Sequence, residues 1–133
     1  MNDYNKNRHA YYKLTYHLVV VTKYRHKCIS QPMMERLKEI TNKLFERWDC
    51  KLIEMNGEED HIHILFDAPP QINLANTINN YKTVTSRYIR KEFPKELSKF
   101  YWKPYFWSRS YMILSTGGAT IEVLKKYIEK QGQ

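Results

Sequence analysis

The spacing of hydrophobic and polar positions changes along the chain, and each change predicts a new element. From residue 14 to residue 20, apolar side chains alternate with Thr15 and His17, which is the period of a strand. The next segment, 23–31, is a basic loop. Pro32 suits the first turn of a helix, and apolar positions then recur at helical spacing to about residue 49. The first third of the chain therefore predicts a strand, a loop and a helix.

The middle of the chain predicts a hairpin followed by a second helix. Residues 51–56 and 61–67 have the composition of strands, and Asn56-Gly57 followed by three acidic residues has the chemistry of a turn. Helical spacing returns over residues 74–88, and Pro94 ends that helix.

The last third predicts one more strand and one more helix. Residues 95–107 are irregular, with room for a single helical turn, and residues 110–116 form a fourth strand. Gly117-Gly118 interrupts the chain before a short helix that contains Ile121 and Ile128. The order β-α-β-β-α-β is that of ferredoxin-like and RNA-recognition-like folds. We therefore expect an α+β domain spanning residues 1–133, with helices on one face of the sheet and a further C-terminal helix.

Composition narrows the class of protein. The chain has 133 residues, of which 42% are hydrophobic, which is too many for a disordered protein. No segment approaches the roughly 18 apolar residues of a membrane span, and the first residues lack the apolar stretch of a signal peptide. Cys28 and Cys50 are far apart, which argues against a zinc site or a disulfide framework. We expect a cytoplasmic protein that does not bind membranes.

Positive charge is concentrated in two segments. Residues 1–27 hold six Lys or Arg and one acid, and residues 68–110 hold eight Lys or Arg and two acids. Such segregation favours a polyanionic partner, and the aromatic residues in both segments suit stacking on unpaired bases. The alternative is a set of solvated basic faces and packed rings. The candidate DNA-binding residues are Lys23, Arg25, Lys27, Lys82, Arg87, Arg90 and Lys91.

His61 and His63 are the most informative pair in the sequence. Residues two apart on a strand point to the same side, so their imidazoles lie together while Ile62 and Ile64 face the core. Two neutral imidazoles on one strand provide half of a divalent-metal site. An isolated His-x-His also arises by chance on strand surfaces, so the pair alone is a weak signal.

Tyr127 and Gln131 lie one turn apart on the predicted last helix. Near a metal, the Gln131 side-chain oxygen would complete a His, His, Gln ligand set. Open positions on that metal would hold and polarise a scissile phosphate, and the Tyr127 hydroxyl would be aimed at its phosphorus. A phenol is a plausible nucleophile that also leaves readily when the reaction reverses. The alternative is a tyrosine used for packing and a glutamine without a role.

Together these residues resemble the insertion-sequence-200-like transposases (TnpA), which are single-tyrosine members of the HUH (His-hydrophobic-His) endonuclease superfamily. The resemblance covers nearly the whole chain, and several motifs occur in the same order. They are His61-Ile62-His63, Lys23-Tyr24-Arg25, the stretch 107–111, Gly117-Gly118-Ala119 and the ending 127–131.

This resemblance implies a single-stranded DNA transposase that acts as a homodimer on element ends with subterminal hairpins. It implies that Tyr127 is the nucleophile, that His61, His63 and Gln131 hold Mg²⁺ or Mn²⁺, and that the intermediate is a 5′-phosphotyrosine beside a free 3′-OH. Gly117-Gly118 stands where a hinge would let the tyrosine helix work on the partner's histidines.

Two segments depart from the family pattern. Val20-Val21-Thr22 stands where a Trp-Cys pair is frequent, and Thr83 to Arg87 stands where Gly-x-Ser-Ser-Arg is frequent. Neither removes a proposed catalytic group. The alternative function is a non-catalytic module that binds single-stranded nucleic acid and has kept the fold. A replication or conjugation nickase is a third reading, but those proteins usually carry further domains.

Overall fold

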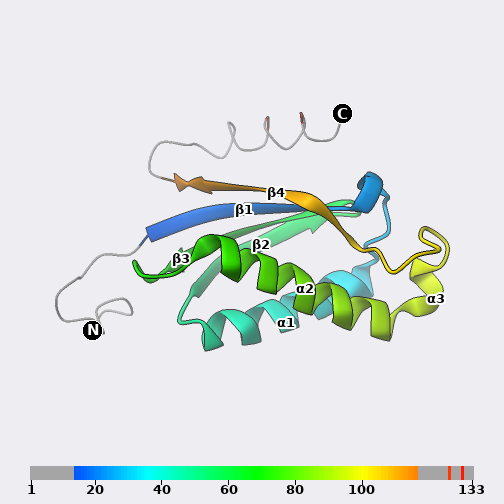
Figure 1. The fold of residues 1–133 in the computed structure, drawn as a ribbon, viewed down its shortest axis with the longest axis horizontal. Helices are drawn as coiled ribbons and strands as arrows, with labels where there is room; N and C mark the ends of the chain where they lie inside the picture. The colour runs from blue at the N-terminus through cyan, green and yellow to red at the C-terminus, as the bar shows by residue number, and fades with distance from the viewer. Residues whose placement is uncertain (1–13, 117–125, 127–129, 131–133) are drawn as a thin grey trace.

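The structure is a computed structural model, and it describes residues 14–116 together with Lys126 and Lys130 (Figure 1). The elements run in the order strand, helix, strand, strand, helix, strand, with two short helical turns between them. They are β1 (Leu14–Thr22), η1 (Lys23–Arg25), α1 (Gln31–Arg47), β2 (Lys51–Glu58), β3 (His61–Ala68), α2 (Leu74–Glu92), α3 (Pro94–Leu97) and β4 (Trp107–Ser115).

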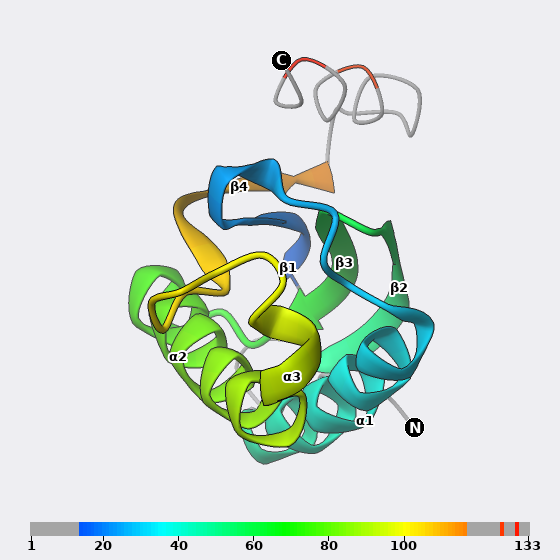
Figure 2. The same ribbon diagram turned by 90° about the vertical axis from the view of Figure 1, so that its right-hand side faces the viewer.

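The four strands form one antiparallel sheet in the order β2-β3-β1-β4. Helices α1 and α2 lie side by side under one face of this sheet, and the two views agree on that arrangement (Figures 1 and 2). The α+β, ferredoxin-like arrangement expected from the sequence is confirmed. The predicted tyrosine helix lies outside the described residues, apart from Lys126 and Lys130, which are helical and exposed.

Local sequence explains where the two long helices begin and end. The Ser30 side chain accepts a hydrogen bond from the backbone N–H of Met33, and Asn73 caps α2 by accepting from the N–H of Asn76. Such caps satisfy backbone donors that have no partner inside the helix. Helix α2 ends at Glu92, two residues before Pro94, because proline disfavours a helical residue before it.

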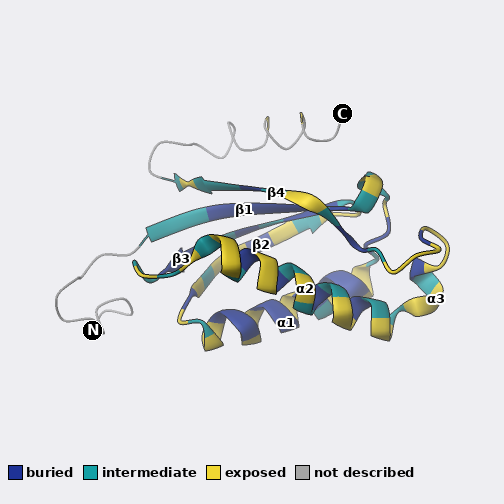
Figure 3. Cartoon of the chain, in the orientation of Figure 1, coloured by how far each residue is buried: buried dark blue, intermediate teal, exposed yellow. Residues whose placement is uncertain are grey.

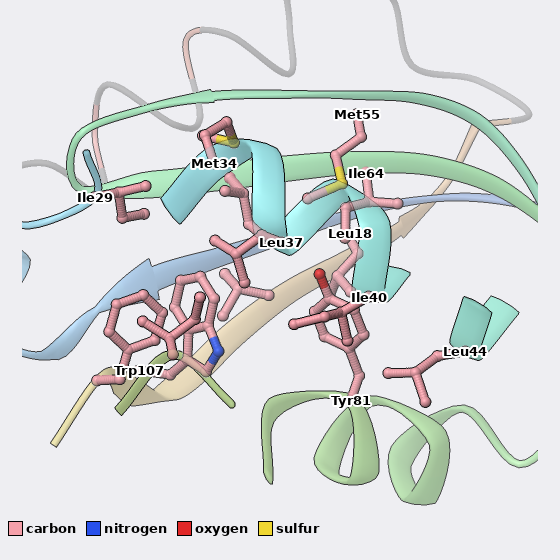
Figure 4. Close-up of a cluster of buried hydrophobic side chains, with 14 of the residues drawn as sticks. Leu18, Ile29, Met34, Leu37, Ile40, Leu44, Met55, Ile64, Tyr81 and Trp107 are labelled. Carbon is pink, nitrogen blue, oxygen red and sulfur yellow. The ribbon is translucent and has the colours of Figure 1, made fainter. Parts of the chain in front are cut away.

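The hydrophobic core fills the space between the helices and the sheet (Figures 3 and 4). Leu37 and Tyr81 are essentially inaccessible to solvent. The Tyr81 hydroxyl lies 2.7 Å from Thr41 Oγ1, and the Trp107 indole N–H donates to Thr85 Oγ1 at 2.9 Å. The buried polar groups of both aromatic rings thus have partners, as burial requires. Among the described elements, no helix has the length and hydropathy needed to cross a membrane.

The predicted β2–β3 hairpin is confirmed, but β2 continues two residues beyond its predicted end, so the turn is shorter than predicted. Asn56 and Gly57 lie inside β2, and the turn is formed by Glu59 and Asp60. Gly57 is needed for close approach instead, because a Cβ there would lie 2.3 Å from the carbonyl oxygen of His61. The predicted fourth strand also begins three residues late, since β4 starts at Trp107.

Candidate functional site

His61 and His63 lie on the sheet face opposite to the one that packs on helices α1 and α2 (Figure 2). In the β1–β3 ladder, Val21 is opposite His61 and Val19 is opposite His63, and directly paired residues share a face. The intervening Ile62 belongs to the core on the other side. The two imidazole rings are nearly parallel, with centroids 6.5 Å apart. The sequence prediction that this pair presents two imidazoles together is confirmed.

His61 is oriented by a carboxylate that is itself held by a guanidinium. Its Nδ1 lies 2.8 Å from Asp60 Oδ1, and Asp60 Oδ2 accepts hydrogen bonds from Nε and Nη2 of Arg25 at 3.3 and 3.1 Å. The backbone N–H of Thr22 also donates to the Asp60 carbonyl at 3.0 Å, which ties this turn to the end of β1. Burial raises the pKa of the Asp60 carboxyl, but the hydrogen bonds from His61 and Arg25 outweigh it and hold that pKa below its usual value.

His63 has a partner that sequence reasoning missed, namely His17 on β1. The His17 Nε2 atom lies 3.2 Å from His63 Nδ1, and the ring centroids are 5.2 Å apart. His17 is 6% exposed, and burial lowers its pKa, although Glu54 acts in the opposite direction. A neutral His17 ring can accept a hydrogen bond from its neighbour. The alternation in β1 indicates on which face of the strand His17 lies, but its contact with His63 follows only from the register between β1 and β3.

The two site histidines therefore share one arrangement, in which Nδ1 of each ring is bonded to a residue behind it. A metal-binding histidine commonly donates its second ring nitrogen in this way, which fixes the tautomer and the ring orientation. With Nδ1 protonated, the lone pair of each imidazole is on Nε2. Within the described part of the chain, no group of three or more His, Cys, Asp or Glu side chains is placed to hold a metal ion. This part of the chain offers two nitrogen ligands of the predicted set.

The three basic residues that follow β1 have different surroundings. Arg25 is engaged with Asp60, and its buried Nη1 has no hydrogen-bond partner among the described residues. Lys27 is exposed. Lys23 lies with its ammonium group about equally far from two tyrosine rings, 5.1 Å from that of Tyr24 and 5.0 Å from that of Tyr105. This segment follows the end of β1 at which Val21 pairs with His61, so it lies at the same end of the sheet as that histidine.

The basic residues of α2 lie in the helix layer, on the other side of the sheet from the histidines (Figure 2). Lys82 donates to the carbonyl of Arg109 at 2.8 Å, and burial lowers its pKa. Arg90 donates to Ser86 Oγ, whereas Arg87 and Lys91 are exposed. The structure thus does not bring the two predicted basic groups together on one face.

The remaining predicted site residues lie outside the described residues. They are Tyr127, Gln131 and the glycines of the predicted hinge.

Known proteins are similar to this chain over nearly its whole length. The family model described as "Transposase IS200 like" matches residues 10–131. The ISDra2 transposase TnpA of Deinococcus radiodurans is 30% identical over 129 residues, covering 97% of this chain and 91% of that protein. The transposase for insertion sequence element IS200 of Salmonella typhimurium is 27% identical, covering 98% and 85%.

Two solved structures have the same fold. A candidate transposase from Deinococcus radiodurans superposes with a TM-score of 0.82 at 30% identity, covering 95% of this chain and 96% of the other. A REP-associated tyrosine transposase bound to a REP hairpin superposes with a TM-score of 0.60 at 11% identity, covering 91% and 64%. At that low identity the second match shows the fold alone.

Proposed function

Since this chain belongs to the IS200-like transposase family, whose members transfer DNA strands, we propose that it cleaves and rejoins single-stranded DNA through a covalent tyrosine intermediate. Tyr127 is the proposed nucleophile, and His61, His63 and Gln131 are the proposed metal ligands. The observation that carries the proposal is the shared arrangement of the two histidines. Nδ1 of His61 is bonded to Asp60, and Nδ1 of His63 is bonded to His17.

The two histidines fit a divalent metal because of their donor chemistry. A hydrogen bond at Nδ1 fixes the orientation of each ring, so each Nε2 lone pair keeps one direction. Less conformational entropy is then lost when the two rings bind an ion. The amide oxygen of Gln131 is the proposed third ligand. When bound, Mg²⁺ or Mn²⁺ would polarise the scissile phosphate and stabilise the charge that develops on it. Imidazole nitrogens suit transition metals better than Mg²⁺, which prefers oxygen ligands, so we expect tighter binding of Mn²⁺.

The proposed reaction exchanges one phosphate ester for another. The phenolic oxygen of Tyr127 forms a bond to phosphorus while the bond from phosphorus to the 3′ oxygen breaks. The phenolic proton is lost, and a proton is taken up by the departing 3′ oxygen. The products are a 5′-phosphotyrosine and a free 3′-OH. Attack by a 3′-OH on the phosphotyrosine then forms a phosphodiester and regenerates the phenol, so no nucleotide cofactor is consumed.

The proposed substrate is a single strand with hairpins near the ends of the mobile element. A REP-associated tyrosine transposase of the same fold has been solved with a REP hairpin, which makes hairpin DNA the first substrate to test. We also propose a homodimer formed through the sheets. The described sheet ends in strands β2 and β4, and an edge strand carries backbone groups able to pair with a second chain.

The decisive experiment is incubation of the protein with a hairpin-bearing single strand and Mn²⁺. We expect a covalent protein–DNA adduct that survives denaturing electrophoresis, is absent with Tyr127→Phe, and is abolished by EDTA. The adduct should form at lower concentrations of Mn²⁺ than of Mg²⁺. If wild-type protein binds the strand but forms no adduct with either metal, and His61→Ala binds equally well, the chain is a non-catalytic binding module.

A further inference from the structure

An aromatic and basic cluster with one exposed ring lies beside the candidate site, and we call it the Tyr24 platform. It consists of Tyr24, Tyr105 and Lys23. The two tyrosine rings meet edge to face at 5.9 Å, and the Lys23 ammonium lies about 5 Å from both ring centroids. Tyr24 is 65% exposed. An aromatic ring that is open to solvent and flanked by a cation has the composition of a surface that stacks bases.

The backbone holds Tyr24 in a conformation that tyrosine rarely adopts. Its φ is 60° and its ψ is 15°, and φ of Arg25 is 56°. Left-handed conformations are uncommon for residues other than glycine, and they persist only where the surroundings enforce them. Here the Tyr101 hydroxyl donates to the Lys23 carbonyl at 2.6 Å, and the Lys23 N–H donates to Phe106 at 2.8 Å. The fold thus fixes the strained turn while most of the Tyr24 ring stays in solvent.

The platform is connected to the candidate site through consecutive residues. Tyr24 precedes Arg25, whose guanidinium bonds Asp60, and Asp60 in turn orients His61. His61 is the first residue of β3 and pairs with Val21 near the end of β1. The turn that carries Tyr24 thus adjoins the end of the sheet at which His61 lies.

We propose that the Tyr24 platform stacks an unpaired base of the substrate strand next to the phosphate held at the histidines. This inference rests on the proposed function and adds a contact to the base itself. The ring of Tyr24 provides the stacking face. Lys23 supplies a positive charge for the adjacent phosphate and for the ring face. Because every base has a π-face, the contact accepts different sequences and fixes the position of the strand.

The test uses short mixed-sequence single strands with 2-aminopurine at successive positions, in EDTA, so that cleavage is not required. The fluorescence of 2-aminopurine falls when it stacks on an aromatic ring. Wild-type protein should quench strongly at one or two positions. Tyr24→Asn should remove that quenching and weaken binding roughly tenfold or more, because asparagine accepts a left-handed backbone but has no ring. Tyr24→Phe should retain both properties.

The matched control is Tyr88→Ala. Tyr88 is 42% exposed and lies under a cation, with the Arg36 guanidinium 5.5 Å from its ring centroid, but it belongs to the helix layer. Its loss should change neither quenching nor affinity. The inference is overturned if Tyr24→Asn, folded by circular dichroism, quenches and binds as wild type does, or if Tyr88→Ala weakens binding equally. If the platform variants behave as expected but no covalent adduct forms with metal, stacking stands and the proposed chemistry fails.

Discussion

His17 and His63 meet across the two central strands, with Nε2 of His17 lying 3.2 Å from Nδ1 of His63. The contact joins a buried ring on β1 to a candidate metal ligand on β3. His61 has a corresponding contact with Asp60, at 2.8 Å. Each candidate ligand thus has its own positioning residue, one an imidazole and the other a carboxylate.

Removal of the His17 ring should loosen His63 without disturbing DNA binding. We expect His17→Ala to weaken Mn²⁺ binding by roughly 10- to 100-fold, because residues behind metal ligands typically contribute that much. Isothermal titration with Mn²⁺ measures this effect, and single-strand affinity in EDTA should be unchanged. The matched control is Thr15→Val, which removes the bond to Asp67 in the same strand pair and should leave Mn²⁺ affinity intact. Equal losses in both variants would contradict the role of His17.

Asp60 should be needed for the orientation of His61. We expect Asp60→Ala to weaken Mn²⁺ binding at least about tenfold. The affinity of Asp60→Asn should lie between those of wild type and Asp60→Ala. The asparagine amide oxygen still accepts a bond from His61 Nδ1, but the side chain no longer carries the charge that pairs with Arg25. Glu59→Gln is the control, since it neutralises an exposed acid in the same turn. If Glu59→Gln and Asp60→Ala reduce affinity alike, local negative charge rather than ring orientation is responsible.

Gly57 should tolerate no side chain. A Cβ at this position would lie 2.3 Å from the His61 carbonyl oxygen and 2.8 Å from the Ile62 Cα, and neither backbone atom can move without displacing β3. We expect Gly57→Ala to lower the free energy of unfolding by about 1–3 kcal/mol and to weaken Mn²⁺ binding as well. Chemical denaturation and metal titration measure the two effects. Ile53→Ala, at an exposed position of β2, should produce neither.

Alkaline pH should destabilise the fold through its buried tyrosines. Burial raises the pKa of Tyr81, despite a hydrogen bond to Thr41, and burial also raises the pKa of Tyr101. The unfolded chain therefore loses these protons first, so the contribution of the two tyrosines to stability should be constant below about pH 10 and fall as the pH rises beyond it. Thermal unfolding followed by circular dichroism across this range measures the decline.

The variant Tyr81→Phe separates the effect of the Tyr81 hydrogen bond on stability from the effect of its ionisation at high pH. At neutral pH it should cost about 1 kcal/mol, the usual value of one buried hydrogen bond, because the 2.7 Å bond between the Tyr81 hydroxyl and Thr41 Oγ1 is lost while Thr41 keeps its bond to the Leu37 carbonyl. Above about pH 10 its stability should decline less steeply than that of wild type. Tyr88→Phe, on an exposed face of the same helix, should change neither quantity. A Tyr81→Phe profile parallel to that of wild type would show that Tyr81 does not contribute.

Much of the architecture was predictable because it depends on local periodicity. The alternation after Leu14, the helical spacing after Pro32 and the helix that ends before Pro94 all match the structure. The hairpin was predictable, but its turn was not, because Asn56-Gly57 has the composition of a turn and is used for close packing inside β2. Composition alone cannot distinguish these two uses of glycine.

The sequence by itself determined the order of the elements, the common face of His61 and His63, and the family motifs, because each depends on residues close together in the chain. The tertiary structure alone decided that His17 lies behind His63 and that Arg25 holds the Asp60 carboxylate. His17 is 46 positions from His63, and Arg25 is 35 positions from Asp60, so both contacts depend on strand register and on the turn after β1. The fold also places Asp60 beside Arg25 and the Arg109 carbonyl of β4 beside Lys82. Two of the predicted DNA-binding side chains therefore bond to groups within the protein.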